Sequence, residues 1–256
     1  MGLSLHVHVR APASLDEPAV RATVTRWHGV AETLATEGRV DRVFELSNEA
    51  ADLSQFATAW LSVPVPGDPD TCTGVAIEPT EGWIFLVQLG KGSEPLVLGL
   101  CRYPATVKAA GGGGLLPSGK DDGWHFLASC KTQYASLNGW ESFRRCHLAA
   151  VDLALAGQSL GLEVRIEDEG GYWPGRDEVA LRAAVERLNR LVAGLAGALK
   201  DVEGSSGDVP SVESPIFAHP AFERLEAEAQ DSADAHKLRE AVQGLRKAIG
   251  AIRKRS

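Results

Sequence analysis

Three short apolar runs in the middle of the chain constrain the fold more than any other feature of the sequence. They span residues 73–77, 83–89 and 95–102, and glycine-containing turn signals separate each run from the next. The gaps between them are too short for the crossover of a dozen or more residues that a parallel strand pair needs. The runs are therefore predicted to form an antiparallel meander, and a doubly wound parallel sheet is disfavoured.

Three more segments have the two-residue period of β-strands. Residues 3–10 alternate apolar and polar side chains, as a half-buried strand does. Residues 124–134 alternate on two faces, which suits a central strand, and residues 162–166 form a shorter strand. Residues 39–66 fit neither the strand period nor the helical period, so no element is predicted there.

Helices are predicted where apolar residues recur every three or four positions. The first helix is expected to begin at a capping box formed by Ser14 and Glu17, with Pro18 in the first turn. Two further helices are expected at residues 140–160 and 177–200. This order of elements indicates an α+β fold with a mainly antiparallel sheet and helices packed on one face, and it allows a ferredoxin-like arrangement.

The chain is predicted to divide into a core and a helical C-terminal extension. Residues 1–201 form the α+β core domain, residues 202–215 have linker composition, and residues 216–256 form the extension. The last helix is expected at residues 233–255, and it is too short to be stable alone, so its apolar stripe must be covered. It either folds back on the helix at 177–200 or pairs with a second copy of the chain.

Overall charge and hydropathy exclude some classes of protein. The chain has 34 acidic and 26 basic residues and a net charge of −8, so its average surface repels phosphate backbones and general nucleic-acid binding is not expected. No apolar window approaches the roughly 18 residues of a membrane span, and the N-terminus lacks the features of a secretory signal. We therefore expect a cytoplasmic protein. The cysteines are far apart in apolar surroundings and are expected to be buried free thiols; they are Cys72, Cys101, Cys130 and Cys146.

One glycine-rich stretch resembles a phosphate-binding loop only superficially. Gly114, Gly119 and Lys120 have the spacing of such a loop, but Asp121 stands where a serine or threonine would hold Mg²⁺. A strand follows instead of the helix whose amides would face the phosphates. A surface loop is the expected structure.

Two histidines in the first strand form a possible metal-binding pair. His6 and His8 project from the same face about 7 Å apart, because alternate residues of a strand share a face. Two ligands make an incomplete site, and a third would have to come from His28, His125 or His147. The simpler interpretation is the polar outer face of an edge strand, so no metal is predicted and the cofactor is left open.

The densest group of reactive polar residues lies between residues 129 and 177. A thiolate could be assisted by a histidine and oriented by a carboxylate, or Glu167 and Glu169 could do acid–base work. This requires the strands at 124 and 162 to be neighbours. The ordinary alternatives are core cysteines, a hydrogen-bonded histidine and a solvated acidic turn. The catalytic candidates are Cys130, Lys131, His147, Asp168 and Glu169.

Aromatic and apolar residues suggest a binding role as the alternative to catalysis. Aromatic residues at strand ends either fill the core or supply interface energy. The candidates for ligand or interface contacts are Tyr134, Tyr172, Trp173, Leu238, Val242 and Leu245. We expect an intracellular binding or accessory module that uses protein–protein or small-ligand contacts, with a protein partner or self-association through the C-terminal helices. An enzyme acting on a small polar substrate through the cluster at residues 129–177 is the alternative.

Overall fold

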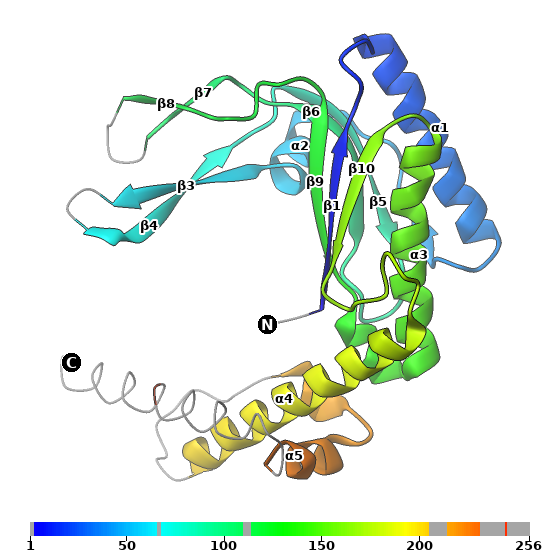
Figure 1. Cartoon of the computed structure of the whole chain (residues 1–256), viewed down its shortest axis with the longest axis vertical. Coiled ribbons are helices and arrows are strands. Elements are labelled where there is room, and N and C mark those ends of the chain that lie inside the picture. The colour runs from blue at the N-terminus through cyan, green and yellow to red at the C-terminus, as the bar shows by residue number, and fades with distance from the viewer. Residues whose placement is uncertain (1–2, 66–67, 110–113, 205–213, 231–243, 245–256) are drawn as a thin grey trace.

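The computed structural model describes residues 3–65, 68–109, 114–204, 214–230 and 244. Its centre is an antiparallel sheet of six strands in the order β10–β1–β9–β6–β5–β2 (Figure 1). The predicted α+β fold with a mainly antiparallel sheet is confirmed. The strands are β1 (Ser4–Arg10), β2 (Arg42–Val43), β5 (Glu81–Gln88), β6 (Leu96–Arg102), β9 (His125–Lys131) and β10 (Glu163–Asp168).

Helices α1 (Glu17–Thr36) and α3 (Trp140–Ser159) pack on one face of this sheet. Trp27 of α1 holds the two layers together: it is fully buried, its ring meets Phe85 edge-on at 5.9 Å, and its indole N–H donates to the Leu153 carbonyl of α3 at 2.7 Å. The strand order β10–β1–β9–β6 with α1 and α3 is compatible with a ferredoxin-like arrangement. The short helix α2 (Ala50–Phe56) lies on the opposite face, next to β5.

The start of α1 differs from the prediction. The side chain that caps the helix is Asp16, which accepts a hydrogen bond from the Ala19 amide at 3.0 Å. The predicted capping box from Ser14 is therefore wrong. A carboxylate caps an N-terminus well because it accepts a free amide and interacts favourably with the helix dipole. Pro18 lies in the first turn, as expected.

Two hairpins stand apart from the main sheet. Strands β3 (Ala59–Val65) and β4 (Asp68–Ile77) form one two-stranded ribbon, and β7 (Thr106–Lys108) and β8 (Leu115–Pro117) form another. The predicted meander is correct for β5 and β6 but wrong for the first run, which pairs with β3. Strand β5 already has β6 on one side and β2 on the other, so β4 has no edge to join.

The C-terminal part follows β10 and begins with a long helix. Helix α4 (Glu178–Gly204) packs with the short 3₁₀ helix η3 (Pro215–Ala218) and with α5 (Phe222–Gln230) around a small second core. The side chain of Arg144 on α3 binds Glu178 through two hydrogen bonds of 2.6 and 2.8 Å, which fixes the start of α4. Most of the predicted linker and the residues Leu238, Val242 and Leu245 lie outside the described residues, so the domain boundaries and the coverage of the tail stay predictions.

The cysteines and the membrane expectation can also be checked. Cys101, Cys130 and Cys146 are buried free thiols, but Cys72 is exposed. The buried interpretation is wrong for Cys72 because β4 has left the main sheet. Within the described part of the chain, no helix has the length and apolar character that crossing a bilayer requires.

Candidate functional site

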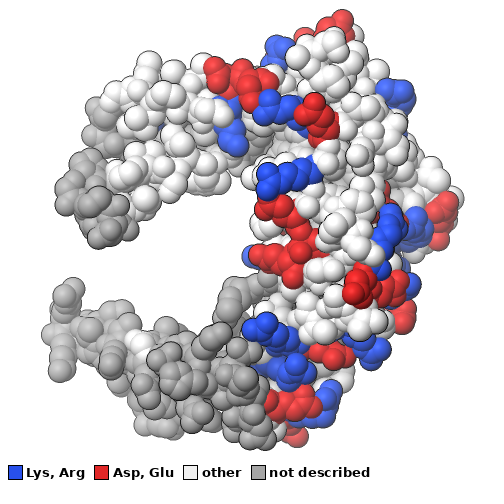
Figure 2. Space-filling model, viewed as in Figure 1, with Lys and Arg blue, Asp and Glu red and all other residues white. Residues whose placement is uncertain are grey.

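A hollow lies on the side of the sheet that α1 and α3 leave uncovered (Figure 2). The two hairpins project beyond the sheet at one end of this hollow, and α4 and α5 lie at the other (Figure 1). The wall between them is the outer side of β10, β1 and β9, which we call the open face. Strand alternation sends Leu5, Val7 and Val9 into the core on the helix side. The open face therefore consists of His6, His8, Arg10, His125, Leu127, Ser129, Lys131, Glu163, Arg165 and Glu167.

Charges of both signs alternate across the open face. Glu167 on β10 contacts His8 on β1 at 3.6 Å and also pairs with Arg165 on its own strand at 2.6 Å. The Leu127 side chain lies opposite His8 and is 47% exposed. A pair of opposite charges on neighbouring strands stabilises a sheet by only about 0.2–1 kcal/mol. The open face is therefore a solvated polar surface with an apolar residue near its middle.

A recess of about 250 Å³ occupies the hairpin end of the open face. His125 lines it, stacks on Tyr103 with ring centroids 5.0 Å apart, and contacts Asp122 at 3.4 Å. Burial lowers the pKa of His125, although the Asp122 carboxylate opposes that shift. The Tyr103 hydroxyl donates to the carbonyl of Ala57 at 2.8 Å, which joins the base of the β3–β4 ribbon to the sheet. The His125 side chain is thus held by Tyr103 and Asp122, and the lining of the recess is mixed in charge.

The β3–β4 ribbon itself carries very little charge. Its only charged residues are Asp68 and Asp70, which lie at the turn end. Trp60 packs over Gly74 of the neighbouring strand, and 68% of the Trp60 residue surface is still exposed. Figure 2 accordingly shows the hairpin side of the hollow as almost uncharged and the sheet wall as charged. Of the large apolar residues that are exposed in the described part of the chain, Trp60 has the largest side chain.

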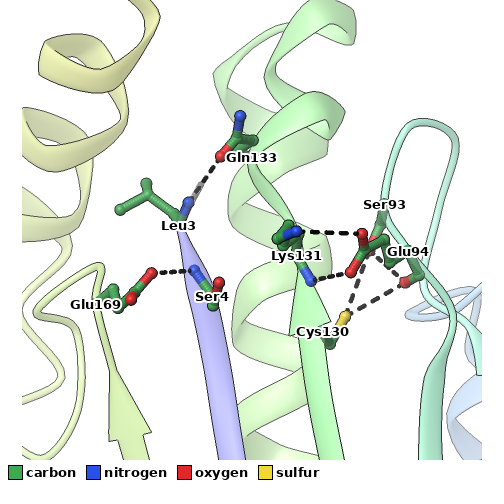
Figure 3. A network of polar contacts seen from close by, with 8 residues as sticks. All are labelled: Leu3, Ser4, Ser93, Glu94, Cys130, Lys131, Gln133 and Glu169. Atoms are coloured by element: carbon green, nitrogen blue, oxygen red, sulfur yellow. Dashed lines mark hydrogen bonds and ion pairs between the residues drawn. The ribbon is translucent and has the colours of Figure 1, made fainter. Parts of the chain in front are cut away.

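The other end of the open face is closed by a network of polar contacts (Figure 3). Glu94 accepts a hydrogen bond from the Lys131 amide at 3.0 Å and lies 3.9 Å from the Lys131 ammonium. Glu169 accepts from the Ser4 amide at 2.8 Å, and Gln133 accepts from the Leu3 amide at 2.7 Å. These side chains satisfy backbone groups at the ends of β1 and β9, so their first role is structural.

On the helix side of the same strands, His147 and Asp168 form a fully buried pair. The His147 Nε2 atom lies 3.2 Å from Asp168 Oδ1, and neither side chain is exposed. The other ring nitrogen, Nδ1, shares a hydrogen bond of 2.9 Å with the Thr132 hydroxyl. The two carboxylate oxygens of Asp168 also accept from the amides of Gly170 at 2.7 Å and Trp173 at 2.9 Å. The pair therefore fixes the turn that follows β10 against α3.

The pKa of Asp168 reflects this environment. Burial raises the pKa of its carboxyl group, but the His147 imidazole and the amides of Trp173 and Gly170 together outweigh that effect. The pKa of Asp168 is consequently held below its usual value, because every one of these groups interacts best with the carboxylate. Asp168 is ionised at neutral pH without contact with solvent.

Cys130 does not join this pair. Its residue is fully buried, its thiol donates to the Glu94 carbonyl at 3.3 Å, and the Ser93 hydroxyl lies 3.9 Å from the sulfur. Burial raises the pKa of Cys130 to about 12, which leaves almost no thiolate at neutral pH. Both ring nitrogens of His147 already have other contacts, so this histidine is not placed to take the thiol proton.

The five catalytic candidates are thus divided by the sheet. The condition that the strands at 124 and 162 be neighbours is not met, because β1 lies between β9 and β10. The two strands still end at the same edge, since both run antiparallel to β1. Cys130, His147 and Asp168 lie on the helix side. At the end of the open face, Lys131 contacts Glu94, and Glu169 accepts a hydrogen bond from the Ser4 amide. Their catalytic roles stay a prediction.

The aromatic candidates split in the same way. Tyr172 is 4% exposed and meets the His147 ring edge-on at 6.1 Å, so it fills the core. Trp173 is half-buried against the same core, and its amide binds Asp168. Tyr134 is half-buried in the 3₁₀ helix η2 (Gln133–Asn138). Of the two alternatives, the core-filling one fits Tyr172.

The metal candidates do not converge in the part of the chain that the structure covers. His6 and His8 share the open face, and Glu167 is the acidic neighbour of His8. His28 meets Phe85 on the helix side, and His147 is buried there, so neither faces the pair. Among the described residues, no three histidine, cysteine, aspartate or glutamate side chains are grouped to hold a metal ion.

Sequence reasoning missed the hollow, the recess and the exposed Trp60. One signal was present: the segment 59–77 has no lysine or arginine and only two acidic residues. That composition is unusual for two solvated strands and could have drawn attention to the weakly charged ribbon. Comparison of the chain with protein-family models, with curated proteins and with solved structures found no significant match.

Proposed function

We propose that the protein is a binding module whose hollow receives a protein partner, held between the β3–β4 ribbon and the open face. The observation that carries this proposal is Trp60, which is 68% exposed on a ribbon whose only charged residues are Asp68 and Asp70. A two-stranded ribbon is marginally stable by itself, so apolar surface on its bare side is a disadvantage unless a partner covers it.

The β3–β4 ribbon can contribute substantial binding free energy. A tryptophan side chain buries roughly 150–250 Å², and covering the exposed two thirds of Trp60 would contribute roughly 3 kcal/mol at about 25 cal/mol per Å². Tryptophan is also among the residues most enriched at interface hot spots. The open face would then supply the polar rim, where paired charges select the partner and its orientation.

A protein partner fits the hollow better than a small ligand does. The recess at the hairpin end measures about 250 Å³, below the roughly 300–1,000 Å³ typical of sites that enclose a small molecule. Its lining mixes acidic and basic side chains, among them Lys120, Asp122 and Glu163. The buried free thiols of Cys101, Cys130 and Cys146 suit a reducing, intracellular compartment, which is where we place the interaction.

Quantitative affinity capture from an extract of the native host tests this proposal. The bait is the full chain, compared with Trp60→Ala and Leu127→Asp, which alter the ribbon and the open face. Matched controls are Phe44→Ala and Val179→Asp, exposed apolar residues outside the surfaces proposed to bind. We expect the recovered amount of one set of proteins to fall at least tenfold with both Trp60→Ala and Leu127→Asp. The recovered amount of the same proteins should be unchanged with both controls.

The captured partner is then purified, and its dissociation constant is measured against the same variants. Identical recovery from the hollow variants and the native chain would exclude the hollow as the binding site. Removal of residues 215–256 is a separate arm that tests the predicted role of the C-terminal helices. Within the enzyme alternative, the route through a nucleophilic thiol rests on Cys130, and the thiol reactivity described in the Discussion tests that route.

A further inference from the structure

Strand β10 is an edge of the main sheet. It pairs with β1 on one side, and within the described residues no strand pairs with its other side. Its inner face is covered by α3 (Figure 1). An edge strand offers unpaired backbone groups to any chain that can align with it.

The hydrogen bonds at the ends of β1 show which backbone groups of β10 point outward. The Glu169 amide donates to the Ser4 carbonyl at 3.2 Å, and on the other side of β1 the Ala11 amide donates to the Trp124 carbonyl. Directions alternate along an antiparallel strand, so odd-numbered residues of β10 face β1. Val164 and Ile166 therefore direct their N–H and C=O groups away from the sheet. Neither residue has another hydrogen-bond partner in the part of the chain that the structure describes.

Charged side chains on an edge strand usually prevent pairing, but those of β10 alternate in sign. Glu163, Arg165 and Glu167 follow one another on the open face. If two copies pair antiparallel about a two-fold axis at Ile166, Arg165 of each copy lies opposite Glu167 of the other. Opposite charges directly across a strand pair are favourable, and like charges are not. The pattern is thus complementary to itself.

The backbone selects this register over the other one that brings opposite charges together. Pairing centred on Val164 would also place opposite charges together, but it needs the Leu162 amide, which already donates to the Gly157 carbonyl at 3.2 Å. Pairing centred on Ile166 needs the Asp168 carbonyl, which accepts from the Gly171 amide at 3.3 Å. A carbonyl oxygen accepts two hydrogen bonds, whereas an amide donates one. A register centred on Arg165 has its backbone groups free as well, but it places Arg165 opposite Arg165 and Glu163 opposite Glu167, which is unfavourable. Of the two registers that bring opposite charges together, only the one at Ile166 leaves its backbone groups available.

We propose that two copies of this chain join through the edges of β10, antiparallel and centred on Ile166, to form one continuous sheet. The two-fold axis then stands perpendicular to the sheet. The helices of both copies lie on one side, and the two open faces become a single surface. This interaction does not depend on the proposed partner in the hollow, nor on the C-terminal helices.

Charge reversal on the full chain tests the pairing, because Arg165 and Glu167 are 76% and 46% exposed as side chains and tolerate substitution. The dissociation constant of the dimer is measured by sedimentation equilibrium. Arg165→Glu and Glu167→Arg should each raise it roughly 10- to 100-fold, because two attractive cross-strand pairs become repulsive. The double variant should return close to the native value.

A mixture of the two single variants gives the sharpest result. In the heterodimer, the glutamate introduced at position 165 of one copy faces the arginine introduced at position 167 of the other, and the native Arg165 and Glu167 form the second pair. Mixing should therefore restore association that neither variant has alone. Circular dichroism verifies that each variant is folded. A native chain that stays monomeric at about 100 µM overturns the proposal, since a Kd far above that range leaves the edges unpaired. Single variants that dimerise like the native chain also overturn it, since the contact then lies elsewhere.

Discussion

The two faces of β10, β1 and β9 are built from the same strands in alternation, yet they differ in every physical respect. On the helix side, Asp168 and His147 are excluded from solvent, and the partners of Asp168 are all fixed. On the open side, Arg165 and Glu167 are solvated and their pairing is worth little. A one-residue step along a strand thus separates groups that determine stability from groups that stay in contact with solvent.

The largest expected effect on stability comes from removing the buried Asp168 carboxylate. Asp168→Ala should lower the free energy of unfolding by about 3–5 kcal/mol, because it leaves His147 and two backbone amides buried without their acceptor. Denaturant unfolding followed by circular dichroism measures the change. Glu163→Ala, on the open face of the same strand, is the control and should cost less than about 0.5 kcal/mol. Equal losses in the two variants would contradict the difference between the faces.

Thiol reactivity probes the same buried side chemically. With a pKa of about 12, raised by burial, Cys130 has roughly 2,000-fold less thiolate at pH 8 than a thiol with the ordinary value of about 8.5. Iodoacetamide should therefore leave Cys130 of the folded protein unmodified while it alkylates the exposed Cys72. Peptide mapping by mass spectrometry reads both sites. Rapid, selective alkylation of Cys130 would instead support the enzyme alternative.

Much of this arrangement follows from local pattern in the sequence. The alternation of residues 3–10 and the helical stripe that contains Trp27 predict their elements correctly, since each has one buried face. Residues 39–66 are not assigned an element from the sequence because β3 lies outside the main sheet and pairs only with β4. No face of this ribbon is fully packed in the main core, so its sequence lacks a clear alternation of apolar and polar residues. The sequence groups His147 with Asp168, but it does not reveal that the ring nitrogens contact Thr132 and Asp168 rather than Cys130. These contacts join residues from different elements, so they depend on the tertiary structure.

Gly170, next to the buried His147–Asp168 pair, allows the tightness of packing on the helix side to be tested. A Cβ atom at Gly170 would lie 2.6 Å from the Leu181 side chain and 3.2 Å from the His147 ring. Gly170→Ala should therefore cost about 1–3 kcal/mol, since a tightly packed site has no room for an added methyl group. Gly175→Ala is the matched control, because nothing lies within 4 Å of its Cβ position. Thermal unfolding of both variants measures the difference, and equal melting temperatures would show that the site around Asp168 is loosely packed.

Acid unfolding tests the charge of Asp168 with a smaller expected effect. The folded pKa of this carboxyl group is lowered, so its contribution to stability is fully present above the unfolded value of about 3.9 and is lost as pH falls through the folded value. Between about pH 5 and 2, the native chain should lose stability more steeply than Asp168→Asn, which cannot be protonated. Parallel stability curves for the two proteins would show that the carboxylate form is not favoured by folding.

The smallest expected effect is the one that decides whether the open face is available. Leu127 and Phe126 are adjacent on β9, but Leu127 is 47% exposed and Phe126 is 3% exposed. Phe126→Ala should cost about 3–5 kcal/mol, whereas Leu127→Ala should change the free energy of unfolding by no more than about 0.5 kcal/mol. The measurement is made at low protein concentration, so that association does not contribute. A loss above about 1 kcal/mol for Leu127→Ala would mean that another part of the folded chain covers this residue. The hollow would then be filled by the protein itself, and no partner could use it.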